Sequence, residues 1–274
     1  MAECSFHPGR ETFRSCSRCG RPACHECLVD APVGAQCVAC VRAGRPPASQ
    51  RVRVRLAQPA LVTQALIAVM AAVQVVSLMG GGSSGVGLGS DNRLADDWAL
   101  WGPAVRDGEW WRLLTAGFLH YGLLHILFNC WALWALGRTI ESVLGRARYL
   151  GLFVVSVLGG SAGALLLSPN ALTAGASGGV FGILAAGVVV SRRAGIPFNA
   201  SGYGPTLVMN IIITLTIPGI SIGGHAGGAI AGALAATAMV TDVRRRNRPG
   251  RDAAAIGLLA VVFVAVAVAA AARA

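Results

Sequence analysis

The chain has 274 residues, of which 54% are hydrophobic, and its mean hydropathy is +0.61. These values exclude an ordinary soluble domain and favour a polytopic membrane protein. All 23 basic residues are Arg and the net charge is +11. The arginines gather beside apolar segments, a placement that the positive-inside rule of membrane topology explains. We therefore expect no nucleic-acid partner. We also expect no cleavable signal peptide, since the N-terminus is polar and rich in cysteine.

Residues 1–41 are predicted to form a separate zinc-binding domain. Eight soft ligands occur in pairs whose members are separated by two residues, which suits two structural Zn²⁺ ions with four ligands each. The metal would supply the folding free energy that so short a segment cannot obtain from an apolar core. We expect the first and third pairs to share one ion, and the second and fourth the other. The pairs are Cys4 and His7, Cys16 and Cys19, Cys24 and Cys27, and Cys37 and Cys40.

The same segment resembles B-box-type zinc fingers. The sequence does not prove how its ligands pair, and His25 is either a surface residue or a substitute ligand. Disulfides are the alternative, but they require an oxidising compartment. The purpose of the domain stays open between recruitment of a cytosolic partner, regulation and simple attachment.

The rest of the chain predicts a multi-pass protein of the cell membrane. Residues 42–58 form a basic linker whose arginines can lie against anionic lipid head groups of the bilayer. Arginine-rich loops alternate with arginine-poor ones, so the N-terminus is expected to be cytoplasmic and the C-terminus external. The apolar segments lie at about 59–79, 118–137, 149–167, 177–191, 205–218, 224–241 and 253–272.

A small-residue turn, Gly175-Ala176-Ser177-Gly178, opens the fourth apolar segment. An apolar segment needs no hydroxyl there, so Ser177 is a candidate nucleophile, although serine and glycine also mediate helix packing in membranes. From Ser177 to Arg192 a helix spans about 22 Å, against about 30 Å of hydrocarbon. Ser177 is therefore expected roughly 8 Å below the outer surface, where non-helical backbone must be shielded by protein or line a wet cavity.

Other polar residues are expected at the same depth. His125 and Asn129 share one face of the second segment, and His225 lies at the start of the sixth. These segments and the fourth all run from outside to inside. Interhelical hydrogen bonds are the alternative explanation, but polar groups in membrane helices mark sites by default.

In combination, these motifs resemble the rhomboid intramembrane serine proteases over roughly residues 59–242. The resemblance implies an all-α fold with a six-helix core, so that residues 253–272 form an additional transmembrane helix and residues 205–218 the proposed lateral gate. The resemblance rests on Trp111-Arg112, His120, His125-x3-Asn129, Gly175-Ala176-Ser177-Gly178, and Gly224-His225-Ala226-Gly227-Gly228 with Gly232.

The activity implied is cleavage of transmembrane protein substrates near the external end of their helix, with no catalytic cofactor. Ser177 would be the nucleophile and His225 the general base of a dyad. The oxyanion would be met by the Ser177 backbone N–H and the side chains of His125 and Asn129. Supporting roles fall to Gly175, Gly178, His120, Phe181 and Glu141, with Phe181 stacking on the catalytic histidine.

Several rival functions remain. An inactive rhomboid-like protein would bind client helices, with the zinc domain recruiting a cytosolic partner, but it would be expected to lose Ser177 or His225. A transporter would need ionisable groups near the bilayer centre. A metal-dependent intramembrane protease would need a His-Glu-x2-His motif, which the sequence lacks.

Overall fold

A computed structural model describes residues 2–31, 33–44, 59–81, 92–216, 219–240 and 249–274. The chain divides into two compact units, Met1–Ala57 and Gln58–Ala274. Most of the basic linker predicted at 42–58 lies outside the described residues, since the description stops at 44 and resumes at 59. Each unit is described by itself below.

The N-terminal unit consists of two small antiparallel hairpins and two short helices. Its core is made of cysteine side chains and Ala23, with Phe6 and Leu28 packed against them. Little apolar surface is therefore buried, and the cysteine side chains occupy the positions of a core. The elements are β1 (Ala2–Glu3) paired with β2 (Glu11–Thr12), η1 (His25–Cys27), β3 (Leu28–Asp30) paired with β4 (Ala35–Cys37), and α1 (Val38–Ala43).

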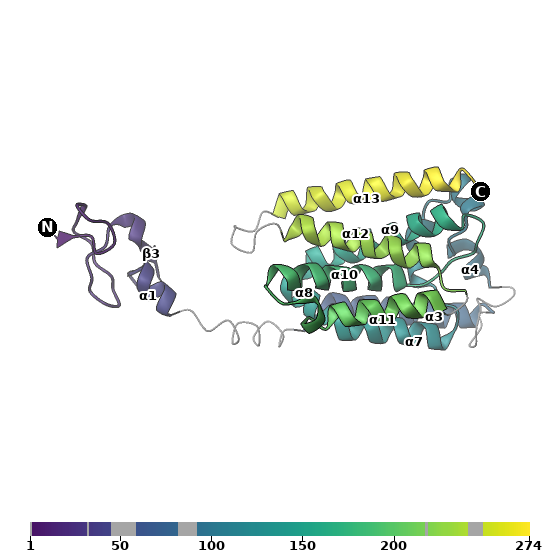
Figure 1. Ribbon diagram of the computed structural model, residues 1–274, viewed down its shortest axis with the longest axis horizontal. Helices are drawn as coiled ribbons and strands as arrows, with labels where there is room; N and C mark the ends of the chain where they lie inside the picture. Colours follow the sequence, from purple (N-terminus) through teal and green to yellow (C-terminus); the bar gives the residue numbers. More distant parts are fainter. Residues whose placement is uncertain (1, 32, 45–58, 82–91, 217–218, 241–248) are drawn as a thin grey trace. The chain divides into compact units, whose positions relative to one another are not determined.

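The second unit is a bundle of long helices that lie side by side, with short helices at one end (Figure 1). The first long helix, α3, spans Leu61–Met79. The short elements that follow are α4 (Arg93–Trp98), α5 (Gly102–Arg106), α6 (Arg112–Thr115) and η2 (Ala116–Phe118). The remaining helices are α7 (Leu123–Ala132), the π-helical η3 (Leu133–Gly137), α8 (Arg138–Leu144), α9 (Arg146–Leu167), α10 (Ser177–Arg193), η4 (Phe198–Ala200), α11 (Tyr203–Thr216), α12 (Ile222–Met239) and α13 (Pro249–Ala271).

Each predicted apolar segment contains a helix, so the fold is that of an all-α polytopic membrane protein. The second segment was expected from 118, but its helix begins at Leu123, because Gly122 has φ 104° and interrupts the helix there. Among the described residues, four helices are long and apolar enough to cross a membrane: Leu61–Met79, Leu123–Leu144, Arg146–Leu167 and Gly250–Ala271. The 14 residues of α11 cover only about 21 Å.

Helix α9 forms the centre of the bundle and packs against α10, α12 and α13. Small residues let the helix backbones touch: a Cβ placed on Gly228 of α12 would overlap the carbonyl oxygen of Gly178 on α10. This close approach fixes the start of α10 against the start of α12. The predicted supporting residue Gly178 thus serves helix packing.

Glu141 holds α8 to the beginning of α3. Its carboxylate, 4% exposed, accepts hydrogen bonds from the backbone N–H groups of Val62 and Thr63 and from the Thr63 hydroxyl, at 2.8–3.0 Å. These N–H groups have no partner within the helix, and a negative charge is favourable at a helix N-terminus. Glu141 is therefore structural, as expected from the sequence.

Candidate active site and metal-binding clusters

Ser177 is the first residue of α10 and follows a turn that only glycine suits. Gly175 has φ 134°, a conformation that L-residues avoid. A Cβ at Gly175 would lie 2.7 Å from His125 Cε1 and 3.0 Å from His125 Nε2, and the Ser177 Oγ is 3.7 Å from the same point. The hydroxyl and the imidazole therefore both lie close to Gly175, and a side chain there would displace His125.

The hydrogen bonds of His125 define which of its nitrogens carries the proton. The backbone N–H of Tyr121 donates to His125 Nδ1 at 3.2 Å, and the Tyr121 ring stacks on the imidazole. Because a backbone N–H can only donate, Nδ1 carries no hydrogen, and the neutral ring is protonated on Nε2. That N–H lies on the side of Gly175, so His125 presents a donor beside Ser177.

Two further predicted residues lie around His125. The buried Asn129 donates one amide hydrogen to the His125 carbonyl at 2.9 Å, which leaves a second hydrogen for a ligand. His120 is also buried and meets the His125 ring edge-on, with ring centroids 5.1 Å apart. The backbone N–H of Ala176 donates to His120 Nε2 at 3.5 Å, so His120 supports the turn that carries Ser177.

His225 lies in the first turn of α12 and stacks on Phe181 of α10. The two ring centroids are 4.0 Å apart and the rings are nearly parallel, as the sequence analysis expects for Phe181. Phe181 follows Ser177 by four residues, so both belong to the face of α10 that meets α12. Ser177, His125 and His225 are all half-buried. Within the described residues no hydrogen bond joins Ser177 to His225, so a dyad would require them to approach further when substrate binds.

Thr214 of α11 is a polar neighbour of His225 that the sequence analysis does not single out. Its Oγ1 lies 2.6 Å from His225 Nδ1 and 2.7 Å from the Asn210 carbonyl oxygen. One signal for it exists in the sequence: Thr206, Asn210 and Thr214 recur every four residues and form a polar face on an otherwise apolar helix.

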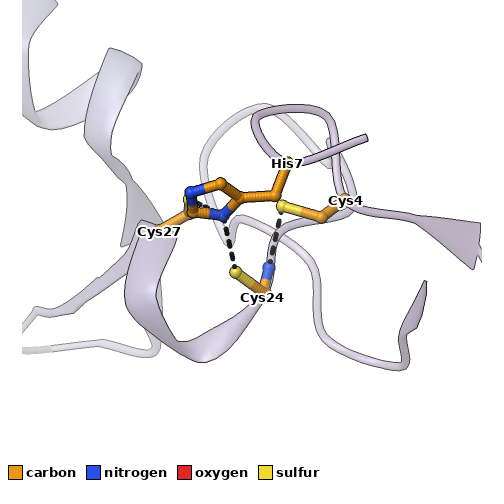
Figure 2. Close-up of side chains that lie close together, drawn as sticks. All are labelled: Cys4, His7, Cys24 and Cys27. Atoms are coloured by element: carbon orange, nitrogen blue, oxygen red, sulfur yellow. Dashed lines mark hydrogen bonds between the residues drawn. The ribbon is translucent and has the colours of Figure 1, made fainter. Parts of the chain in front are cut away.

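The N-terminal unit contains two groups of side chains that could hold metal ions. Figure 2 shows the first, in which the ligand atoms converge on one point. In each group these atoms lie within 4.8 Å of one another, and the grouping is interleaved, as the sequence predicts. His25 belongs to neither group. The groups are Cys4, His7, Cys24 and Cys27, and Cys16, Cys19, Cys37 and Cys40.

The spacing fits a tetrahedral ion. With a Zn–S bond of about 2.3 Å, two sulfurs of one tetrahedron are about 3.8 Å apart, and a sulfur and a nitrogen are about 3.5 Å apart. Cys19 Sγ and Cys37 Sγ are separated by 3.8 Å. His7 Nδ1 lies 3.3 Å from the Sγ atoms of both Cys24 and Cys27. The residues present therefore fit the metal, and His7 would bind it through Nδ1.

The thiols differ in acidity. Contact with His7 lowers the pKa of Cys24 to about 5, and the backbone N–H of Cys37 lowers the pKa of Cys16 to about 6. Burial raises the pKa of Cys27 to about 11. A thiolate thus forms readily in each group, whereas ionisation of all the crowded thiols, three in the first group and four in the second, needs a cation to balance the charge.

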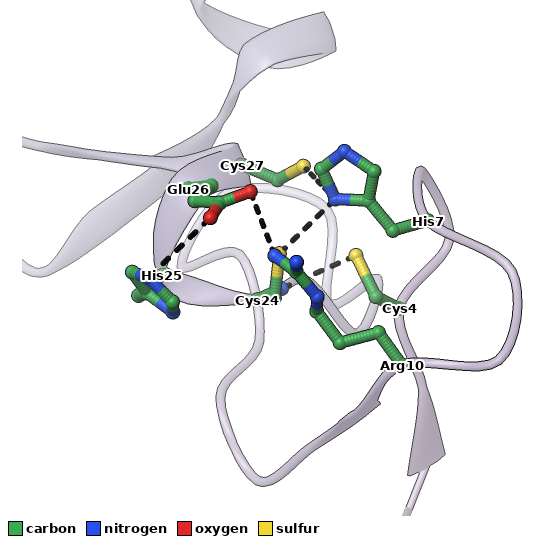
Figure 3. A network of polar contacts seen from close by, with 7 residues as sticks. All are labelled: Cys4, His7, Arg10, Cys24, His25, Glu26 and Cys27. Atoms are coloured by element: carbon green, nitrogen blue, oxygen red, sulfur yellow. Dashed lines mark hydrogen bonds and ion pairs between the residues drawn. The ribbon is translucent and has the colours of Figure 1, made fainter.

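A second layer of contacts surrounds the first group (Figure 3). The Arg10 guanidinium lies 3.6 Å from Cys24 Sγ and donates to the Glu26 carboxylate at 2.7 Å. Glu26 therefore holds Arg10 against a ligand sulfur, as outer partners commonly orient metal ligands. His25 lies 3.8 Å from Glu26 with a side chain that is 75% exposed.

The fold and this arrangement together define the class: a multi-pass helical membrane protein with polar side chains gathered around a serine at the start of one helix. Residues 107–242, about half of the chain, match the Rhomboid domain, so the helical unit contains a domain of the rhomboid family. This match includes His120, His125, Ser177 and His225.

Curated proteins that are similar to this chain carry rhomboid names as well. The chain is 37% identical over 139 residues to rhomboid protease GluP of Bacillus subtilis, an alignment that covers 49% of this chain and 27% of that protein. It is 34% identical over 136 residues to RHOMBOID-like protein 5 of Arabidopsis thaliana, covering 47% and 43% of the two chains. With Rhomboid-like protease 1 of Toxoplasma gondii it shares 28% identity over 172 residues, or 57% of each chain. The alignments thus span less than two thirds of these relatives.

Proposed function

We propose that the protein is an intramembrane serine endopeptidase that cleaves transmembrane proteins with Ser177 and His225. The observation that supports the proposal is that Ser177 begins α10 close to His125, while Phe181, one turn further along the same helix, stacks on His225 of α12. His125 also lies close to Gly175. Relatives named as rhomboid proteases support the same activity.

The proposed chemistry uses the two histidines differently. The Ser177 Oγ attacks the scissile carbonyl while His225 Nε2 takes its proton, and the same nitrogen then returns the proton to the leaving amine. Water hydrolyses the resulting acyl-enzyme by the same sequence. The oxyanion would receive hydrogen bonds from the Ser177 backbone N–H, His125 Nε2–H and the free amide hydrogen of Asn129. No catalytic cofactor is required.

The remaining features complete the proposal. Residues 59–242 would form the six-helix catalytic core, with residues 253–272 as an additional transmembrane helix in the cell membrane. The N-terminus would be cytoplasmic and the C-terminus external, which places cleavage near the external end of the substrate helix. Residues 1–41 would bind two structural Zn²⁺ ions, because the two groups offer one histidine and seven cysteines at tetrahedral spacing.

The proposal is tested by reconstituting the full chain in lipid vesicles with a single-span substrate protein. The wild type should cleave within or just outside the substrate's external helix end, whereas Ser177→Ala and His225→Ala should reduce cleavage to background. A serine-reactive fluorophosphonate should label the wild type and leave Ser177→Ala unlabelled. Equal labelling of both proteins would overturn the assignment, and absence of cleavage with tight binding of the substrate would instead indicate an inactive client-binding protein.

A further inference from the structure

We propose that Thr214 is a positioning residue, which fixes the proton of His225 on Nδ1 and so leaves Nε2 free to act as the base toward Ser177. The inference rests on the proposed function of Ser177 and His225. It assigns to a neutral hydroxyl on α11 the orienting role that an acidic side chain holds in other serine hydrolases. Among the described residues, no carboxylate forms a hydrogen bond or ion pair with His225.

The direction of the hydrogen bonds follows from what each group can do. The Thr214 hydroxyl has one hydrogen and two neighbours within bonding distance, the Asn210 carbonyl at 2.7 Å and His225 Nδ1 at 2.6 Å. The carbonyl can only accept, and two oxygens at 2.7 Å repel unless a hydrogen lies between them. The hydroxyl hydrogen therefore points to Asn210, and the hydroxyl oxygen accepts from His225, whose Nδ1 must carry a hydrogen.

This assignment makes the two histidines complementary. His125 accepts a backbone N–H at Nδ1 and so presents Nε2–H as a donor. His225 donates from Nδ1 and so presents a bare Nε2 as an acceptor. The tautomer of an imidazole is set by the bond that its other nitrogen makes. A general base needs an Nε2 without hydrogen, and an oxyanion donor needs an Nε2 that carries one. The Thr214 hydroxyl therefore selects the tautomer that a base requires at His225, and the Tyr121 N–H selects the one that a donor requires at His125.

The surroundings hold the hydroxyl in place. Thr214 is only 6% exposed on a helix whose other faces carry exposed apolar side chains such as Met209 and Leu215. The face of the imidazole packs on the Phe181 ring, with ring centroids 4.0 Å apart. His225 is thus confined by a ring on α10 and a hydroxyl on α11. As it gains a proton during attack, the bond from Nδ1 becomes charge-assisted and strengthens.

Thr214→Val tests the inference, because it keeps the shape of the side chain and removes the acceptor. The rate of labelling by a small fluorophosphonate should fall about tenfold, and kcat for a single-span substrate should fall by a similar factor with KM changed less than about twofold. Thr214→Ser should restore both rates to within about threefold of the wild type. Thr216→Val is the matched control, since the exposed Thr216 hydroxyl bonds only within α11.

A spectroscopic readout separates positioning from packing. The chain has five histidines, and ¹⁵N-histidine spectra of wild type and His225→Ala would identify the resonances of residue 225. We expect the Nδ1–H tautomer in the wild type and in Thr214→Ser, and its loss in Thr214→Val. Wild-type labelling rates in Thr214→Val, or equal impairment of the Val and Ser variants, would overturn the inference alone. If instead Ser177→Ala is labelled as fast as the wild type, the proposed function fails and this inference fails with it.

Discussion

The two units of this chain differ in the interactions that stabilise each of them. In the N-terminal unit the buried side chains are mostly the cysteines of two ligand groups. In the helical unit most of the buried side chains are apolar, and glycines let the helices touch, as where Gly228 lies against the Gly178 carbonyl. The first unit thus depends on its metal-ligating side chains, whereas the second depends chiefly on the packing of its helices. The two units should therefore unfold under different treatments.

Metal removal should have the largest effect and should act on the N-terminal unit alone. Structural zinc contributes about 10–16 kcal/mol in small domains, as much as the whole stability of a typical domain, so residues 2–44 should unfold without it. The full chain should contain two metal ions by elemental analysis, and chelation should make this segment sensitive to limited proteolysis. Fluorophosphonate labelling of Ser177 should persist. Loss of labelling on chelation would show that the units are coupled.

Gly228→Leu should have the next largest effect and should act on the helical unit alone. The new side chain would meet the Gly178 carbonyl and force α10 and α12 apart, at a cost of about 3 kcal/mol or more, because backbone cannot yield as a side chain can. Thermal unfolding in detergent should shift downward while the metal content stays constant. Gly257→Leu on α13 is the control, since a Cβ there meets no described atom within 4 Å. Equal unfolding temperatures for the two variants would contradict this packing.

Gly175→Ala should separate backbone strain from loss of a catalytic contact. Positive φ costs an alanine about 1–2 kcal/mol. A cost of this kind also applies at Gly195, where φ is 78°, closer to the left-handed region, and a Cβ would meet no atom of the described residues within 4 Å. Of these two positions, only Gly175 would direct the methyl group against His125. Both variants should lose stability, Gly175→Ala more because its methyl group also meets His125, but only Gly175→Ala should lose about a hundredfold in kcat, the value of one oxyanion donor. A similar kcat in both variants would remove His125 from the oxyanion proposal.

The smallest effect is expected at the ion pair between Arg148 of α9 and Asp252 of α13. The pair is partly buried, so Asp252→Asn should lower stability by about 1 kcal/mol and the unfolding temperature by a few degrees. Asp107→Asn, which breaks a more exposed pair with Arg106, should change little. If both substitutions lower the unfolding temperature equally, the Arg148–Asp252 pair does not anchor α13.

Much of this fold follows from local patterns in the sequence. Apolar runs locate each long helix to within a few residues, and the paired spacing of Cys4, His7 and the other ligands predicts both groups. Helix ends were less predictable, because they depend on single backbone conformations such as that of Gly122. Thr214 was missed since it lies 11 residues before His225 on another helix, a distance that no local period relates.

The bond between Thr214 and His225 joins α11 to α12, and α11 is the helix that the resemblance to rhomboid proteases implies as a lateral gate. If α11 swings outward to admit a client, it carries the threonine away and the imidazole loses its anchor. Bond cleavage then has to wait until the helix has returned. Substrate entry and nucleophilic attack by Ser177 would then occur one after the other, and no cleavage would take place while α11 is displaced.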